Sequence, residues 1–180
     1  MNMKALISYL LVSSLIIAGC VSLETVQNLG THELAEETNE VLKEREDPFA
    51  IGDFSPIDEN LLAAIKEEIS NIEVVEEASI NGNPAGYRML IKPEGYGGPV
   101  EVITFIDLEG KIAKVEIGKH NETAGVGTKV AEPAFLVNFD GISSKEELAA
   151  VDVVSGASYS SGAVKDGILS ALDVFHTYLR

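Results

Sequence analysis

The sequence is poor in cysteine and histidine, and each shortage excludes a class of site. A single cysteine among 180 residues rules out an internal disulfide and a metal cluster built from several thiolates. The three histidines, His32, His120 and His176, are scattered rather than grouped at the spacing of metal ligands, which argues against a metal or haem site. With 46% hydrophobic residues, the length suffices for one compact domain and a tail.

Positive charge is also scarce. The formal net charge is −16, and the acidic excess is concentrated towards the N-terminus. Residues 24–77 hold 16 acidic side chains against 3 basic ones, whereas residues 78–180 hold 13 against 9. Such a field repels phosphate backbones, which argues against nucleic acid as a partner.

The N-terminus has the pattern of a targeting segment. Lys4 precedes an apolar run, and Ile17-Ala18-Gly19-Cys20 resembles the lipobox of bacterial lipoproteins. That resemblance implies a signal segment over residues 1–19, cleavage before Cys20 and a lipid on the Cys20 sulfur. The alternative is an uncut membrane span over Ala5–Leu23, because its 19 uncharged residues approach the ~20 that a helix needs to cross a bilayer. Both alternatives place the rest of the chain at the outer face of the cell membrane.

Residues 20–55 are predicted to form an acidic tether. A helix is expected over His32–Glu46, but its few apolar residues form only a narrow stripe that buries little surface. Asp47-Pro48 ends this helix, and Ser55-Pro56 opens the next element. The folded domain is therefore expected over residues 56–180.

The folded domain is predicted to be α+β, with a small antiparallel sheet and packed helices. Asp58 can cap a helix in which apolar residues recur at helical spacing, and Gly162–Leu179 shows the same spacing. A short helical stretch is expected near Glu132–Val137. The expected strands are Ile72–Ala78, Ala85–Lys92, Val100–Asp107 and Lys111–Gly118. The last two strands form a β-hairpin around the turn Glu109-Gly110.

Two glycine-containing segments are candidates for binding a ligand. The segment Gly95-Tyr96-Gly97-Gly98-Pro99 precedes a strand; its glycines let backbone approach a planar ligand, and Tyr96 can stack, although a strand-entry turn explains it equally well. The segment His120–Lys129 carries Gly125 and Gly127 among small polar residues. It suits a loop whose amides grip a phosphate or a flavin ring edge, and it equally suits a structural loop. It has neither the Walker pattern nor the Rossmann spacing of glycines.

The third candidate segment, Asp152–Ser161, leads into the last helix. Its hydroxyl groups and glycine can donate hydrogen bonds to an anion at a helix N-terminus, where the helix dipole favours negative charge. A plain serine N-cap is the simpler interpretation. A hydrolase with Ser158 as nucleophile and His120 or His176 as base is a further alternative, but no Gly-x-Ser-x-Gly elbow accompanies it.

Taken together and in this order, the three segments resemble the FMN-binding domain family, which includes the G subunit of the Rnf electron-transport complex and the C subunit of the sodium-pumping NADH:quinone reductase. The resemblance runs from about Gly82 to Leu179. In that family, the threonine that closes Ser-Gly-Ala-Thr carries FMN through a phosphoester. A flavin transferase installs the FMN from FAD with magnesium. The resemblance therefore implies that Ser158 is the acceptor.

The same resemblance assigns roles to the other positions of the motifs. Thr123 and Val126 match positions that contact the isoalloxazine ring. The remaining matches are Asp152, Ser155, Gly156 and Ala157 in the recognition sequence, Glu122, Gly125 and Gly127 in the loop, and Tyr96 and Gly97 in the first turn. Ala124 and Val126 replace the usual proline and leucine. Ser158 replaces threonine, which keeps the reactive hydroxyl but frees its χ1 angle.

The resemblance implies an electron carrier rather than an enzyme with its own substrate pocket. A covalent link would keep the flavin from being lost outside the cytoplasm, and the flavin supplies the redox chemistry. Nothing in the chain resembles an NADH site or an iron–sulfur ligand set, so redox partner proteins must deliver the electrons. The carrier can be a subunit of an Rnf-like membrane complex or a free lipoprotein in extracellular electron transfer. The alternative function is a lipoprotein scaffold or binding module with non-covalent or no flavin.

Overall fold

The computed structural model describes Phe49 and residues 52–180. The expected signal segment 1–19, Cys20 and the expected helix His32–Glu46 lie outside the described residues. Among the residues that are described, no helix has both the length and the apolar character needed to cross a membrane.

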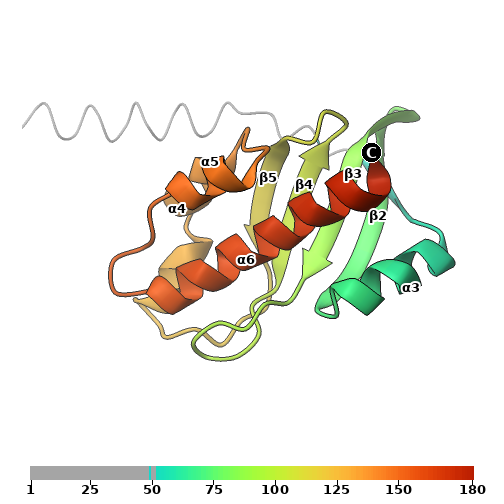
Figure 1. Ribbon diagram of the computed structural model, residues 1–180. Coiled ribbons are helices and arrows are strands. Elements are labelled where there is room, and N and C mark those ends of the chain that lie inside the picture. Colours follow the sequence, from blue (N-terminus) through green and yellow to red (C-terminus); the bar gives the residue numbers. More distant parts are fainter. Residues whose placement is uncertain (1–48, 50–51) are drawn as a thin grey trace, which may run out of the picture. The chain divides into compact units, whose positions relative to one another are not determined.

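The described chain forms a single antiparallel sheet with helices packed on it, which confirms the predicted α+β class (Figure 1). The sheet order is β1-β2-β3-β4-β5, so each strand pairs with its neighbours along the chain. The strands are β1 (Asp53–Pro56), β2 (Ile72–Ile80), β3 (Asn83–Ile91), β4 (Val102–Asp107) and β5 (Ile112–Ile117). The α-helices are α3 (Glu59–Glu68), α4 (Pro133–Leu136), α5 (Lys145–Ala150) and α6 (Ser158–Val174), and the tighter or wider helical turns are η1 (Gly127–Ala131), η2 (Val137–Phe139) and η3 (Phe175–Leu179).

The hairpin turns follow from local turn chemistry. Between β2 and β3, Asn81 and Gly82 have φ angles of 54° and 77°, the left-handed conformation that tight hairpin turns require at both central positions. Between β4 and β5, the Asp107 carboxylate accepts hydrogen bonds from the amides of Glu109 and Lys111, at 3.0 and 2.8 Å. The predicted β4–β5 hairpin is therefore confirmed.

The main core lies between the sheet and α6, which crosses one face of the sheet diagonally (Figure 1). Val164, Ile168 and Leu172 of α6 are buried in the same cluster as the strand side chains. Gly167 permits this close approach, since a Cβ at that position would lie 2.8 Å from the Cβ of Val102. The large apolar interface fixes α6 on the sheet and so fixes the position of the N-terminal end of α6.

A smaller apolar cluster contains Phe49, Ala78 and Phe105, with Phe54 of β1 packed against it. The guanidinium of Arg88 lies 4.0 Å from the centre of the Phe54 ring, and its Nε donates to Glu76 at 2.7 Å. These contacts tie β1 to the sheet. The strand was not expected from the sequence, because four residues of mixed character that end in proline give no alternating pattern.

The structure corrects two further expectations. Helix α6 begins at Ser158 rather than at Gly162, so the serines expected in the preceding loop form its first turn. The residue that caps it is Ala157, and no side chain of the described residues caps it, so the interpretation as a serine N-cap is wrong. Helix α5 was missed because six residues are too short to display an amphipathic period; it is capped by Ser144, whose hydroxyl accepts from the Glu147 amide.

Candidate functional site

A pocket of about 320 Å³ lies at the N-terminal end of α6, within the range of roughly 300–1,000 Å³ that small-molecule sites occupy. Its walls come from the turn at Tyr96, the loop after β5 and the start of α6. The lining residues are Tyr96, Thr123, Val126, Gly127, Gly156, Ala157, Ser158, Tyr159 and Ser160. All three segments singled out in the sequence therefore contribute to one pocket.

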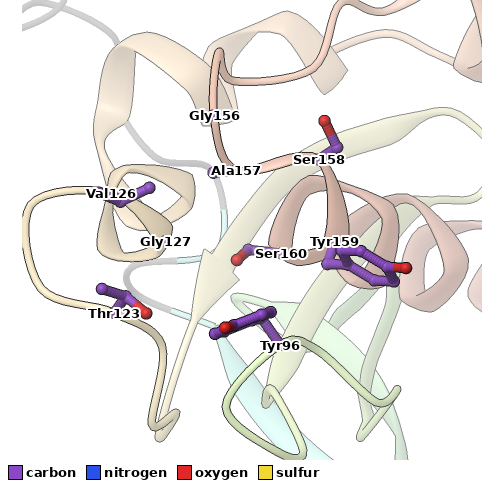
Figure 2. A pocket seen from close by; sticks show the side chains of 9 residues that line it. All are labelled: Tyr96, Thr123, Val126, Gly127, Gly156, Ala157, Ser158, Tyr159 and Ser160. Carbon is purple, nitrogen blue, oxygen red and sulfur yellow. The ribbon is translucent and has the colours of Figure 1, made fainter.

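The pocket is asymmetric. Tyr96 and Tyr159 lie close together on one side, and Thr123 and Val126 lie across from them (Figure 2). The two tyrosines are strongly exposed, at 71% and 77%, and their ring centres are 6.4 Å apart. Val126 is 42% exposed. The pocket therefore offers aromatic and apolar surface to the solvent, which suits a flat, largely apolar ligand group.

One buried carboxylate joins the three wall segments. Glu122 is only 6% exposed. Its Oε1 accepts from the amide of Gly97 at 2.9 Å, and its Oε2 accepts from the hydroxyl of Ser160. Because Gly97 belongs to the first segment, Glu122 to the second and Ser160 to α6, this carboxylate sets the spacing of the pocket walls. We call Glu122, Gly97 and Ser160 the carboxylate clasp.

The glycines around the clasp are required by space. A Cβ on Gly97 would lie 2.0 Å from the Asn121 carbonyl oxygen, which is a backbone clash. A Cβ on Gly127 would lie 2.8 Å from both Glu122 Oε2 and Ser160 Oγ. These glycines therefore allow the backbone segments to approach each other around the buried carboxylate.

The hydroxyl groups at the start of α6 differ in their surroundings. Ser160 and Ser161 are 2% and 0% exposed, and the Ser161 hydroxyl accepts from the Val154 amide at 3.0 Å. Ser158 is exposed, and within the described part of the chain nothing hydrogen-bonds to its hydroxyl. Of the three serines in this first turn, Ser158 alone presents a hydroxyl that is both accessible and uncommitted.

The first turn of α6 also suits an anion. It carries no acidic residue and no side-chain cap among the described residues, so its amides retain their capacity to donate hydrogen bonds. Gly156, with φ of +78°, turns the chain into the helix without a side chain that would cover these amides. The pocket thus combines a helix end with the capacity to bind an anion and a surface that suits a planar group.

The structure separates the twelve cofactor-binding residues named from the sequence into two sets. Those that line the pocket are Tyr96, Thr123, Val126, Gly127, Gly156, Ala157 and Ser158. Of the others, Gly97 and Glu122 belong to the clasp, and Gly125, with φ of +72°, donates its amide to Thr128 Oγ1 at 2.9 Å. Asp152 and Ser155 are exposed in the segment before α6 and do not line the pocket.

Two lining residues, Tyr159 and Ser160, lie within the candidate segment Asp152–Ser161 but were not named individually as cofactor-binding residues. Their separate roles could not be found from the sequence, since only the three-dimensional contacts distinguish the buried Ser160 hydroxyl from the exposed Tyr159 ring.

The site lies within a region that is similar to known proteins. The family model described as the FMN-binding domain matches residues 95–173, which include all three wall segments. The chain is 31% identical over 185 residues to the G subunit of the Na⁺-translocating ferredoxin:NAD⁺ oxidoreductase complex of Acetobacterium woodii, an alignment that covers 92% of this chain and 88% of that protein.

Two further similarities extend this result. The G subunit of the proton-translocating ferredoxin:NAD⁺ oxidoreductase complex of Clostridium ljungdahlii is 26% identical over 110 residues, covering 56% of this chain and 60% of that protein. The crystal structure of the C subunit of the Na⁺-translocating NADH-quinone reductase of Parabacteroides distasonis has the same fold at a TM-score of 0.52 and 18% identity, with 89% and 98% of the two chains covered. Given the family match over the pocket and the relative that is similar over most of its length, the chain belongs to the FMN-binding domain family.

Proposed function

We propose that this protein is an electron-transfer flavoprotein that carries FMN as a phosphoester on Ser158, at the outer face of the cell membrane, within an ion-translocating oxidoreductase complex. The family assignment supports FMN as the ligand. The relatives from Acetobacterium woodii and Clostridium ljungdahlii are named as subunits of such complexes, which supports the setting. Electrons would arrive from, and leave to, redox partner proteins.

The observation that carries the proposal is the accessible, uncommitted hydroxyl of Ser158 at the pocket. Thr123 also presents an exposed hydroxyl to the pocket, but it lies in the loop, away from the anion-binding end of α6. Among the residues that line the pocket, Ser158 is the one that combines an accessible aliphatic hydroxyl with the free amides of a helix N-terminus. This supports Ser158 as the attachment point of the FMN phosphate.

The attachment reaction balances with FAD as the donor and a flavin transferase with magnesium as the catalyst. The Ser158 Oγ–P bond forms at the FMN phosphorus, the pyrophosphate bond of FAD breaks, AMP leaves and the hydroxyl proton is released. This chain contributes the nucleophilic hydroxyl, together with the recognition sequence, in which Asp152, Ser155 and Gly156 are exposed and Ala157 is buried. Bound FMN supplies the redox chemistry, and the protein supplies position and environment.

The ring of FMN fits the rest of the pocket. Thr123 and Val126 form one wall, and Gly127 brings the loop backbone close to the start of α6. The carboxylate clasp holds these walls apart at a fixed spacing. Preorganisation of this kind lowers the cost of ordering a site when its ligand binds.

The anchor is proposed to be either a lipid on Cys20 or an uncut N-terminal span, with the acidic stretch from residue 20 as the tether. The FMN-binding domain includes β1 and the buried Phe49, so it begins before the expected residue 56. A lipid anchor is compatible with a free carrier in an extracellular electron-transfer chain, whereas a span is typical of a protein that is part of a membrane complex. The protein is purified from membranes with and without detergent, and the proteins that co-purify are identified. This experiment distinguishes a free carrier from a subunit of a membrane complex. Metabolic labelling with palmitate, compared between wild type and Cys20→Ser, tests the lipid.

The attachment is tested by intact mass and by flavin fluorescence after denaturing electrophoresis. Wild type, Ser158→Ala, Ser158→Thr and Ser70→Ala are each coexpressed with a flavin transferase and exported; Ser70 is exposed and lies outside the pocket and the recognition sequence. We expect covalent flavin in wild type, in Ser158→Thr and in the matched control Ser70→Ala, and none in Ser158→Ala. Covalent flavin retained by Ser158→Ala would show that another hydroxyl is the acceptor, and flavin in none of the four proteins would overturn covalent attachment and favour a scaffold.

A further inference from the structure

Tyr96 and Tyr159 are the two most exposed large apolar side chains among the described residues, at 71% and 77%. Both line the same pocket, although they come from segments more than 60 positions apart in the sequence. Large aromatic rings held in solvent leave apolar surface unburied. A flat, largely apolar ligand group is suited to cover both rings.

The backbones that carry the two rings are fixed by the same carboxylate. The Gly97 amide, one residue after Tyr96, and the Ser160 hydroxyl, one residue after Tyr159, both donate to Glu122. The distance between the two rings is therefore set by the buried carboxylate clasp rather than by contact between the rings themselves. This arrangement presents two aromatic faces in advance of any ligand.

The spacing of the rings is suited to an inserted plane. The ring centres are 6.4 Å apart and the planes are inclined at 53°, so the rings do not stack on each other. A flat group between two parallel rings needs about 7 Å, which is twice the ~3.5 Å contact distance between carbon atoms. Rotation of the two exposed tyrosine side chains, with a small increase in the distance between their ring centres, provides that space. The side chains can rotate because nothing in the described structure forms a hydrogen bond with their hydroxyl groups.

We propose that Tyr159, together with Tyr96, forms an aromatic clamp on the isoalloxazine ring of the flavin. The inference rests on the proposed function, since it places the ring of FMN anchored at Ser158 next to the residue that follows the anchor. Tyr159 is a flavin-contacting residue in this arrangement and restricts the access of solvent to one end of the ring. Thr123 and Val126 approach the ring from the opposite wall.

The clamp is tested on flavin-loaded, full-length protein with two spectroscopic readouts. The first is flavin fluorescence in the native state relative to the denatured state. The second is the rate constant for collisional quenching by iodide, which reports exposure of the ring. The variants are Tyr159→Leu, Tyr96→Leu and Tyr159→Phe, and Val153→Ala is the control. Val153 is 49% exposed in the segment before α6 but does not line the pocket.

Tyr159→Leu is expected to raise both readouts by about two- to tenfold, because a lost aromatic contact shifts the population of stacked flavin by that factor. Tyr96→Leu should act in the same direction. Tyr159→Phe retains the ring and should keep the low iodide quenching of wild type, as should Val153→Ala. Fully loaded Tyr159→Leu with wild-type values in both readouts would overturn the clamp while leaving attachment at Ser158 intact.

The intact mass of each preparation separates this outcome from failure of the attachment itself. If wild type carries no covalent flavin, the same variants are titrated with free FMN in the unloaded state. Quenching of FMN by wild type but not by Tyr159→Leu would then support the clamp without the ester. Equal quenching by both proteins, or by neither, would overturn it.

Discussion

The Glu122 carboxylate accepts a hydrogen bond from the hydroxyl of Ser160, which lies 38 positions further along the chain. Its other oxygen accepts from the Gly97 amide, 25 positions earlier. A buried acceptor shared by two donors stabilises the fold only while both bonds are made, since an unpaired buried group carries its full desolvation penalty. The geometry of the proposed FMN pocket therefore depends on a residue that does not line the pocket.

Replacing Glu122 is expected to lower both stability and flavin loading. Glu122→Ala leaves the buried Ser160 hydroxyl without its acceptor, which costs about 1–3 kcal/mol. It also removes the bond from the amide of Gly97, which is exposed. Glu122→Gln keeps an acceptor oxygen and the volume, so its loss should be smaller. Urea unfolding gives the free energies, and the mass of flavin-loaded protein gives the occupancy.

Glu132→Gln is the matched control for the clasp. Glu132 is exposed and its side chain caps no helix, so its replacement should change stability by less than about 0.5 kcal/mol. Glu122→Ala with wild-type stability and loading would show that the walls hold their spacing without the carboxylate.

Two glycine-to-alanine substitutions should change the free energy of unfolding in opposite directions. In Gly97→Ala, the new Cβ would lie 2.0 Å from the Asn121 carbonyl oxygen, so the turn and the loop must separate. Gly162 lies inside α6, and nothing lies within 4 Å of a Cβ built there. We expect Gly162→Ala to raise the free energy of unfolding by about 0.4–1 kcal/mol and Gly97→Ala to lower it by more than that amount. Thermal unfolding measures both, and stabilisation by Gly97→Ala would contradict the close approach of the two segments.

The sequence predicted the fold class, four of the five strands and the three segments that form the pocket, because alternating strands and glycine-rich turns are local signals. Strand β1 and helix α5 were not predicted because each is too short to show a period. The start of α6 was placed four residues late, since Ser158–Ser161 has the pattern of a polar loop and not of a helical turn.

The roles within the site could be predicted only in part. The motif indicated which residues gather, but not that Glu122 is buried and bonded to Ser160. Glutamate and serine are common polar residues, and these two lie far apart in the sequence. No local sequence pattern therefore predicts the bond between them. The same limit applies to Tyr96 and Tyr159, whose proximity depends on how two distant segments meet.

Lys165 bonds the backbone just before the proposed recognition segment. Its ammonium donates to the carbonyl oxygens of Ala149 and Val151, at 3.2 and 2.8 Å, at the C-terminal end of α5. Lys165→Met keeps the aliphatic stem and removes these donors, and hydrogen bonds that involve a charged group contribute about 1.5–3 kcal/mol. We expect faster amide hydrogen exchange in residues 152–157 and lower stability, with Lys66→Met, an exposed lysine of α3, as the control. Unchanged exchange in residues 152–157 would show that this segment does not depend on the contacts of Lys165.

The stability contributed by Glu101 should depend on pH. The amide of Lys119 donates to its carboxylate at 2.9 Å, and with the ammonium of Lys92 this bond lowers the pKa of Glu101 below its ordinary value against an opposing effect of burial. A lowered folded-state pKa means that the stabilisation is present above the unfolded-state pKa of about 4.3 and is lost as the pH falls through the folded-state pKa. Glu101→Gln should therefore be less stable than wild type at pH 7. The difference should shrink as urea unfolding is repeated below about pH 4.

The control is Glu73→Gln, which removes the other, half-exposed carboxylate beside Lys92. Such a surface pair contributes only about 0–1 kcal/mol to stability. A difference between wild type and Glu101→Gln that stayed constant from pH 7 to pH 3 would mean that the charge of Glu101 does not contribute to folding.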